Sequence, residues 1–140
     1  MVQFVLTKYS ITSCLNSKDV NVGEACFYAG VYTYDLGSEN ASLSYFLRSC
    51  ESKENYQDGC LKFTVHSLKL NKKKQAIWSS QKICNKKIQT GCFILTTLLQ
   101  DYNQLEKAKS TSKKACFDWK DEDSCFLYGG ILWGLVSQSA

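Results

Sequence analysis

The sequence predicts an all-α fold built from helical repeats, and the spacing of its eight cysteines is the main reason. The cysteines form four successive pairs: Cys14/Cys26, Cys50/Cys60, Cys84/Cys92 and Cys116/Cys125. The first members of successive pairs are 36, 34 and 32 residues apart, and the second members are 34, 32 and 33 apart. A step of about 34 residues is typical of arrays in which each unit of paired helices packs on the next. We therefore expect the 140 residues to form one α/α solenoid domain.

Composition and local pattern support the helices. Proline is absent and glycine occurs only 8 times, which suits helices joined by short polar turns. A small residue, a cysteine and a large apolar residue recur in register, as in Gly59-Cys60-Leu61 and Gly91-Cys92-Phe93. In three repeats an alanine precedes the first cysteine by eight or nine residues, about two helical turns, so that both lie on one helix face. These alanines are Ala41, Ala76 and Ala108.

We call the helix that contains the second cysteine of a pair an A helix, and the helix that ends at the first cysteine of the next pair a B helix. The pattern predicts about eight antiparallel helices, at residues 2–14, 23–34, 40–50, 57–70, 73–84, 89–100, 104–116 and 123–136. The domain accordingly divides into a leading helix (1–14), repeats 23–50, 57–84 and 89–116, and a closing helix (123–136). Positions three and seven beyond the cysteine of each A helix are expected to face the core: Ala29, Phe63, Leu95, Tyr128, Thr33, Ser67, Leu99 and Leu132.

The cysteines themselves are expected to form disulfides. Members of a pair are 12, 10, 8 and 9 residues apart, and a helix–turn–helix of that length brings the two Cβ atoms close to bridging distance. Eight cysteines allow 105 pairings, and the repeat favours 14–26, 50–60, 84–92 and 116–125. Each bridge is expected to stabilise the fold by about 2–3 kcal/mol. Zinc sites use closely spaced cysteines or histidines, whereas this chain has no Cys-x-x-Cys and only His66, so neither a metal nor a cofactor is expected.

Several partner classes are disfavoured. The net charge is +4, but the only arginine is Arg48 and the lysines cluster in turns, so no nucleic acid is expected. The longest apolar run, residues 126–136, is short of the roughly 20 residues that span a bilayer, so no membrane insertion is expected. The same run makes the closing helix strongly apolar. It is either covered by the preceding helices, or it pairs with a partner or with a second copy as a homodimer.

The Gly-Cys-apolar and Ala-x7-Cys elements resemble the Sel1-like repeat (a TPR-like repeat) in the cysteine-rich form known from Helicobacter cysteine-rich proteins. The matching segments are 76–92, 108–125 and 41–60. The resemblance implies a right-handed α/α superhelix in which a disulfide joins consecutive helices. It also implies an adaptor surface: relatives act in secretion, signalling and host contact, some neutralise secreted toxins as immunity proteins, and some bind or slowly hydrolyse penicillin-like molecules.

The leading functional hypothesis is non-enzymatic protein binding in an oxidising compartment, such as the periplasm or outside the cell, with any signal peptide removed. An immunity protein or inhibitor of a secreted toxin or effector suits a small, cross-linked module. The concave surface of a solenoid is lined by its A helices, here at positions two and six beyond each cysteine. Those positions hold Tyr28, Tyr32, Lys62, His66, Ile94 and Leu98, each of which could instead be a core residue.

Two alternatives remain. Ser79-Ser80-Gln81-Lys82 and Ser110-Thr111-Ser112-Lys113 contain S-x-x-K, which places a serine and a lysine on one helix face as a β-lactam-binding or weak β-lactamase site requires. No S-D-N or K-T-G motif accompanies them, so no catalytic residue is assigned. The second alternative is an assembly factor of the mitochondrial intermembrane space, where cysteine-rich relatives occur.

Overall fold

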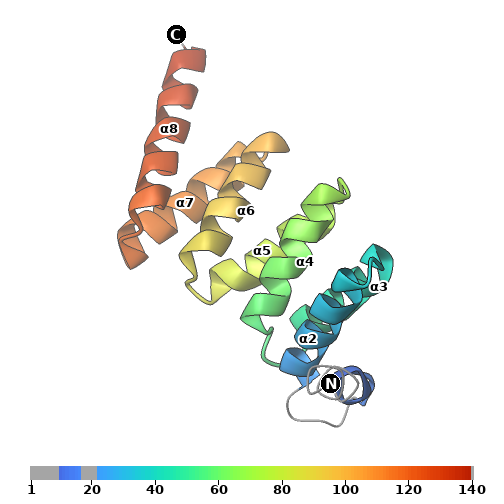
Figure 1. Ribbon diagram of the computed structural model, residues 1–140. Helices are drawn as coiled ribbons and strands as arrows, with labels where there is room; N and C mark the ends of the chain where they lie inside the picture. The colour runs from blue at the N-terminus through green and yellow to red at the C-terminus, as the bar shows by residue number, and fades with distance from the viewer. Residues whose placement is uncertain (1–9, 17–21, 140) are drawn as a thin grey trace. The chain divides into compact units, whose positions relative to one another are not determined.

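The computed structural model describes residues 10–16 and 22–139, and within these ranges the chain is helical and contains no strand (Figure 1). Residues 10–15 are helical, and seven further helices follow. They are α2 (Val22–Asp35), α3 (Glu39–Glu51), α4 (Gln57–Lys69), α5 (Lys73–Asn85), α6 (Gln89–Asp101), α7 (Leu105–Trp119) and α8 (Glu122–Ser139). The predicted all-α class is confirmed, with the bounds of α2 to α8 within three residues of those expected. Residues 2–9 of the predicted leading helix lie outside the described residues.

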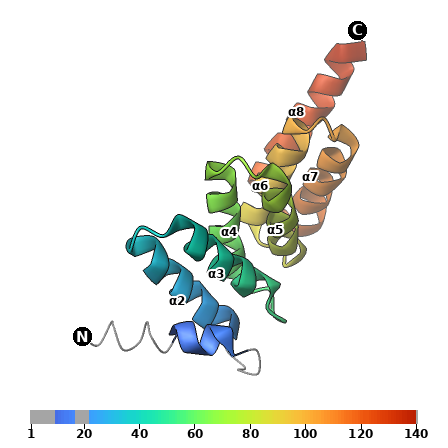
Figure 2. The same cartoon turned by 90° about the vertical axis from the view of Figure 1, so that its right-hand side faces the viewer.

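The helices fall into two compact units that divide after Lys72. In the first unit α3 packs on α2 and on α4, and Figure 2 shows α2 and α3 lying side by side. In the second unit α6 packs on α5 and α7, while α8 packs on α7 and, over a smaller area, on α6. The expectation that residues 1–140 form a single repeat domain stays a prediction.

The turns that follow the A helices share one backbone geometry. Each has three residues, and the middle one has a positive φ: 87° at Gly37, 58° at Asn71 and 57° at Asn103. Glycine adopts this left-handed conformation freely, and asparagine tolerates it better than most residues. In each turn the last residue donates its N–H to a carbonyl five residues earlier, at 2.7–3.0 Å: Ser38 to Thr33, Lys72 to Ser67 and Gln104 to Leu99.

The interior of both units consists mainly of small side chains. Among the described residues, nineteen apolar side chains are buried; six of them are cysteines and five are alanines, so these two types make up eleven. Small side chains let helices approach closely, but each buries little apolar area. The fold therefore gains less from hydrophobic burial than a core rich in leucine and phenylalanine would.

Serine and threonine hydroxyls fill much of the remaining interior. Most of them donate to a carbonyl one turn earlier in their own helix, as Thr64 does to Cys60 and Thr96 does to Cys92, both at 2.8 Å. Ser49 instead donates across helices, from α3 to the carbonyl of Gly23 in α2 at 2.6 Å. The buried hydroxyl of Ser67 has no hydrogen-bond partner among the described residues. Nearly every buried hydroxyl thus satisfies its own hydrogen bond locally, as burial requires.

The predicted core positions are confirmed in part. Ala29, Phe63, Leu95, Ser67 and Leu99 are buried. The prediction was wrong for Thr33, Tyr128 and Leu132, which are only half-buried.

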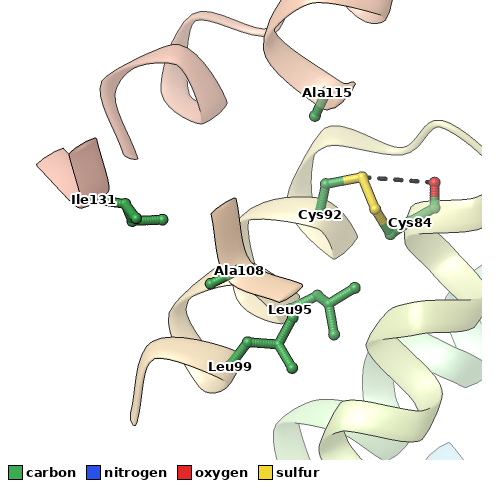
Figure 3. Close-up of a cluster of buried hydrophobic side chains, with 7 residues drawn as sticks. All are labelled: Cys84, Cys92, Leu95, Leu99, Ala108, Ala115 and Ile131. Carbon is green, nitrogen blue, oxygen red and sulfur yellow. Dashed lines mark hydrogen bonds between the residues drawn. A yellow bond between two sulfur atoms is a disulfide. The ribbon is translucent and has the colours of Figure 1, made fainter. Parts of the chain in front are cut away.

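In α8 the buried position is different. Ile131, six residues beyond the cysteine, is 3% exposed and belongs to the cluster that includes Leu95, Leu99 and Ala108 (Figure 3). The reason is that α8 packs only on the side that faces α6 and α7.

Candidate interaction surface

Four disulfides fix the junctions between consecutive helices. They join Cys14 to Cys26, Cys50 to Cys60, Cys84 to Cys92 and Cys116 to Cys125, the pairing that the repeat predicts, and leave no free cysteine. The paired Cα atoms are 4.4–4.6 Å apart, near the short end of the range for disulfides.

The recurring small residue before the second cysteine is explained by this close approach. A Cβ atom at Gly91 would lie 2.5 Å from the Cβ of Ile83, and one at Gly59 would collide with the side chain of Ser49. Both glycines therefore mark places where an A helix lies directly against the preceding B helix. The residue pattern seen in the sequence is a packing requirement of the disulfide junction.

In the first unit, six rings form a continuous series of contacts, which we call the aromatic series. Its members are Tyr28, Phe27, Tyr56, Phe46, His66 and Tyr34. The centroid of Phe27 is 5.2 Å from that of Tyr28, 5.8 Å from that of Tyr56 and 6.2 Å from that of Phe46. His66 then stacks on Phe46 at 5.3 Å and meets Tyr34 at 4.8 Å. The series connects α2, α3 and α4.

Gly30 makes room for the centre of the series. Phe46 projects from α3 against Gly30 in α2, and a Cβ atom at Gly30 would lie only 2.5 Å from the Cε1 atom of Phe46. Phe46 is 1% exposed, so its ring is a structural element of the core. The rings around it are more open: Phe27, Tyr34, Tyr56 and His66 are half-buried, and Tyr28 is 50% exposed. The series is therefore anchored in the core and accessible at its periphery.

The end of the series at His66 is basic. Lys62 and Lys69 lie on the same helix as His66, one turn before it and one turn after it, and both are exposed. The ammonium group of Lys69 donates to the hydroxyl of Tyr34 at 3.3 Å and lies 5.6 Å from the centroid of that ring. Burial lowers the pKa of His66 below its ordinary value of 6.5, and Lys62 and Lys69 lower it further against the opposing effect of Glu39.

The opposite end, at Tyr56, is acidic. Burial raises the pKa of the Tyr56 hydroxyl above its ordinary value of 10.0, and the negative charges of Glu24 and Asp58 raise it further, with a smaller contribution from Tyr28. Two lysines thus lie near the His66 end of the aromatic series, and two acidic side chains lie near its Tyr56 end.

An open depression adjoins the basic end. It has a volume of about 800 Å³ and is lined by Tyr34 and by the turn and first residues of α3, Gly37, Ser38, Glu39, Asn40 and Ala41. The depression is open to solvent and does not form an enclosed cavity.

The residues predicted to bind a partner divide by exposure. Tyr28 and Lys62 are exposed, and Tyr32, His66 and Ile94 are half-buried. Leu98 is only 4% exposed, so it is the core residue that the sequence allowed as an alternative at each of these positions. Whether the other five bind a partner stays a prediction.

Sequence reasoning missed Phe27, Tyr34 and Tyr56. The available signal was the spacing of Phe27 and Tyr34, seven residues apart and therefore on one face of α2.

The two S-x-x-K motifs have different environments. Ser79 is fully buried, and its hydroxyl donates to the carbonyls of Gln75 and Ala76 at 3.1 and 3.3 Å. The ammonium group of Lys82 lies 5.7 Å from the centroid of the Trp78 ring. In the second motif, Ser110 and Lys113 are both exposed. A buried hydroxyl that is bonded to its own helix is poorly placed to attack a substrate.

No family model, curated protein or solved structure matches this chain. Among the described helices, none combines the length and the hydrophobicity needed to cross a membrane.

Proposed function

We propose that this chain is a non-enzymatic protein-binding module of an oxidising compartment, and that it binds its partner through the aromatic series and the neighbouring Lys62 and Lys69. The observation that carries the proposal is the continuity of the six rings from the buried Phe46 to the exposed Tyr28. Tyrosine side chains that are held in place by a packed core lose little entropy on binding and are frequent energetic centres of interfaces.

The repeats are proposed to be units of a Sel1-like α/α solenoid. The support is their common register. Three A helices bury the residue three positions beyond the cysteine, three A helices end in the same left-handed turn, and each B helix is joined to the following A helix by a disulfide. These shared features are what a tandem array of one structural unit requires.

Four disulfides fit an oxidising compartment. The bacterial periplasm or the extracellular space is the proposed location. Many buried side chains of this chain are small and contribute little hydrophobic stabilisation. In an oxidising compartment, disulfides can supply the stability that larger buried side chains would otherwise provide.

The proposed partner is a secreted toxin or effector, which this chain would neutralise as an immunity protein or inhibitor. A surface that is fixed by buried rings and by disulfides is pre-organised, and pre-organisation favours tight binding to one dedicated partner. The opposite charge at the two ends of the series would add selectivity for that partner.

The test is affinity capture from the native organism with matched surface variants. Wild-type protein is compared with Tyr28→Ala and Lys62→Glu, which alter the proposed surface, and with Phe117→Ala, an exposed aromatic residue in the other unit. Removing a side chain that contributes about 1.4 kcal/mol to the binding free energy weakens binding about tenfold. We expect the partner to be recovered with wild type and Phe117→Ala, and to be lost with the two surface variants, while the circular dichroism of all four stays the same.

The toxin assignment has its own readout. The captured protein should arrest growth when it is expressed alone in the compartment, and growth should recover when wild-type chain, but not Tyr28→Ala, is co-expressed. Equal capture by all variants would contradict the proposed surface. Capture without toxicity would retain the surface and contradict the immunity role.

A further inference from the structure

Helix α8 has the same types of residue as α2 at equivalent positions: an aromatic residue, a glycine and a second aromatic residue. In α2 the residues one, four and eight positions beyond Cys26 are Phe27, Gly30 and Tyr34. In α8 the residues one, four and eight positions beyond Cys125 are Phe126, Gly129 and Trp133. Both helices thus present an aromatic ring, a glycine and a second aromatic ring along one face.

In α2 the glycine on this face is covered, and the two rings beside it are half-buried. The ring of Phe46 from α3 lies against Gly30 and contacts Phe27, and His66 from α4 lies between Phe46 and Tyr34. Because Gly30 has no side chain, it leaves a recess on α2, and the ring of Phe46 from α3 fills that recess. The two aromatic residues of α2 border that recess.

In α8 the equivalent face is open among the described residues. Phe126 is 82% exposed and Trp133 is 74% exposed, more than any other large apolar side chain that the structure describes. A Cβ atom added at Gly129 or at the adjacent Gly130 would meet nothing within 4 Å. The other side of α8 is packed, with Ile131 and Ser124 buried. Exposed aromatic side chains that gather on one helix face mark an interaction site.

The chemistry of this face favours a second copy of the chain as its occupant. Residues 124–139 contain no charged side chain, so two chains that each carry a net charge of +4 can meet here without bringing like charges into contact. The face also contains both halves of the packing seen between α2 and α3: an aromatic ring and a glycine recess. A surface that supplies both halves can pair with itself about a twofold axis.

We propose that α8 pairs with α8 of a second copy, with Phe126 and Trp133 of each chain packed against Gly129 and Gly130 of the other. This contact repeats between chains the ring-on-glycine packing that Phe46 and Gly30 make within one chain. It uses a surface in the second unit and is independent of the aromatic series.

The test is sedimentation equilibrium over a wide range of protein concentration. Wild-type chain of 15.8 kDa should show a reversible monomer–dimer equilibrium. Phe126→Ala and Trp133→Ala should shift it to monomer. Gly129→Leu should do the same, because it fills the recess. Since leucine is a better helix former than glycine and the site has open space, Gly129→Leu should leave the monomer folded.

Tyr28→Ala is the matched control, because it removes an exposed aromatic side chain from the first unit. It should leave dimerisation unchanged while it abolishes partner capture, whereas Phe126→Ala should abolish dimerisation and leave partner capture unchanged. A wild-type chain that stays monomeric at every concentration overturns the inference. So does a dimer that tolerates all three α8 substitutions.

Discussion

The imidazole of His66 stacks on the ring of Phe46, with centroids 5.3 Å apart and ring planes inclined by 7°. Phe46 is buried, and His66 is half-buried beside the exposed Lys62 and Lys69. One ring pair therefore connects the core of the first unit with a charged edge. Protonation of His66 would place a positive charge on a core ring stack, so the stability of this unit should depend on pH.

His66 should titrate below the ordinary histidine pKa of 6.5, first because burial disfavours the imidazolium and then because Lys62 and Lys69 repel it. The unfolded chain then binds the proton at a higher pH than the folded chain. The contribution to stability is complete above pH 6.5 and is lost as the pH falls through that value to the folded-state pKa. Imidazole NMR signals followed against pH measure the shift. Urea unfolding at neutral and acidic pH measures the stability.

Two variants control this pH dependence. Lys62→Gln should bring the pKa of His66 closer to 6.5, because it removes a repelling charge. His66→Gln should remove the part of the pH dependence that comes from the imidazole. A His66 pKa at or above 6.5 in the wild-type chain would contradict the prediction.

Ser67→Ala should stabilise the protein, because it removes a buried hydroxyl that lacks a hydrogen-bond partner in the described structure. The gain should be about 1 kcal/mol. Ser49→Ala is the matched comparison and should cost about 1 kcal/mol, since it removes the bond from α3 to the carbonyl of Gly23. Chemical unfolding with the disulfides intact measures both. Destabilisation by Ser67→Ala would mean that the hydroxyl has a role that its surroundings do not reveal.

Gly91→Ala should destabilise the second unit. Its Cβ would lie 2.5 Å from the Cβ of Ile83 and 2.9 Å from the backbone nitrogen of Cys84, so the helices would have to separate at the disulfide. The expected loss is about 1–3 kcal/mol. Thr90→Ala, one residue earlier and exposed, should change the stability by less than about 0.5 kcal/mol. Thermal unfolding of the two variants compares them, and equal melting temperatures would show that the junction is looser than described.

The disulfide between Cys116 and Cys125 should be reduced first. Both of its cysteines are half-buried, whereas the cysteines of the other three disulfides are at most 4% exposed. Thiol–disulfide exchange requires the attacking thiolate to reach a sulfur, so this more accessible bridge should react before the other three. A dithiothreitol time course with alkylation and peptide mass spectrometry gives the order. In denaturant the four bridges should react together, and earlier alkylation of Cys50 and Cys60 in the folded protein would contradict the prediction.

Much of the secondary structure could be predicted because the cysteine spacing in the sequence is periodic. The cysteine step and the alanine spacing located α2 to α8 to within three residues, and the same register gave the disulfide pairing. Burial was harder to predict, since it depends on which neighbour covers a given face. Leu132 is only half-buried, since α8 packs on α6 and α7 with one side. Leu98 in α6 is buried.

The aromatic series could not be predicted from the repeat, because it depends on a departure from it. Phe46 lies in α3, four residues before Cys50. The equivalent positions in α5 and α7 are occupied by Ser80 and Ser112. Four residues beyond the second cysteine, α2 has Gly30, where α4 has Thr64. A large residue and a missing side chain compensate each other only once the two helices are placed side by side.

The interior of cysteine, alanine and serine also affects how the protein matures. Because many of its buried side chains are small, a newly made chain with reduced thiols gains less from burying apolar surface. We therefore expect it to remain unfolded until its disulfides form. The rate of folding would then be limited by the enzymes that form the disulfides and not by the collapse of the chain.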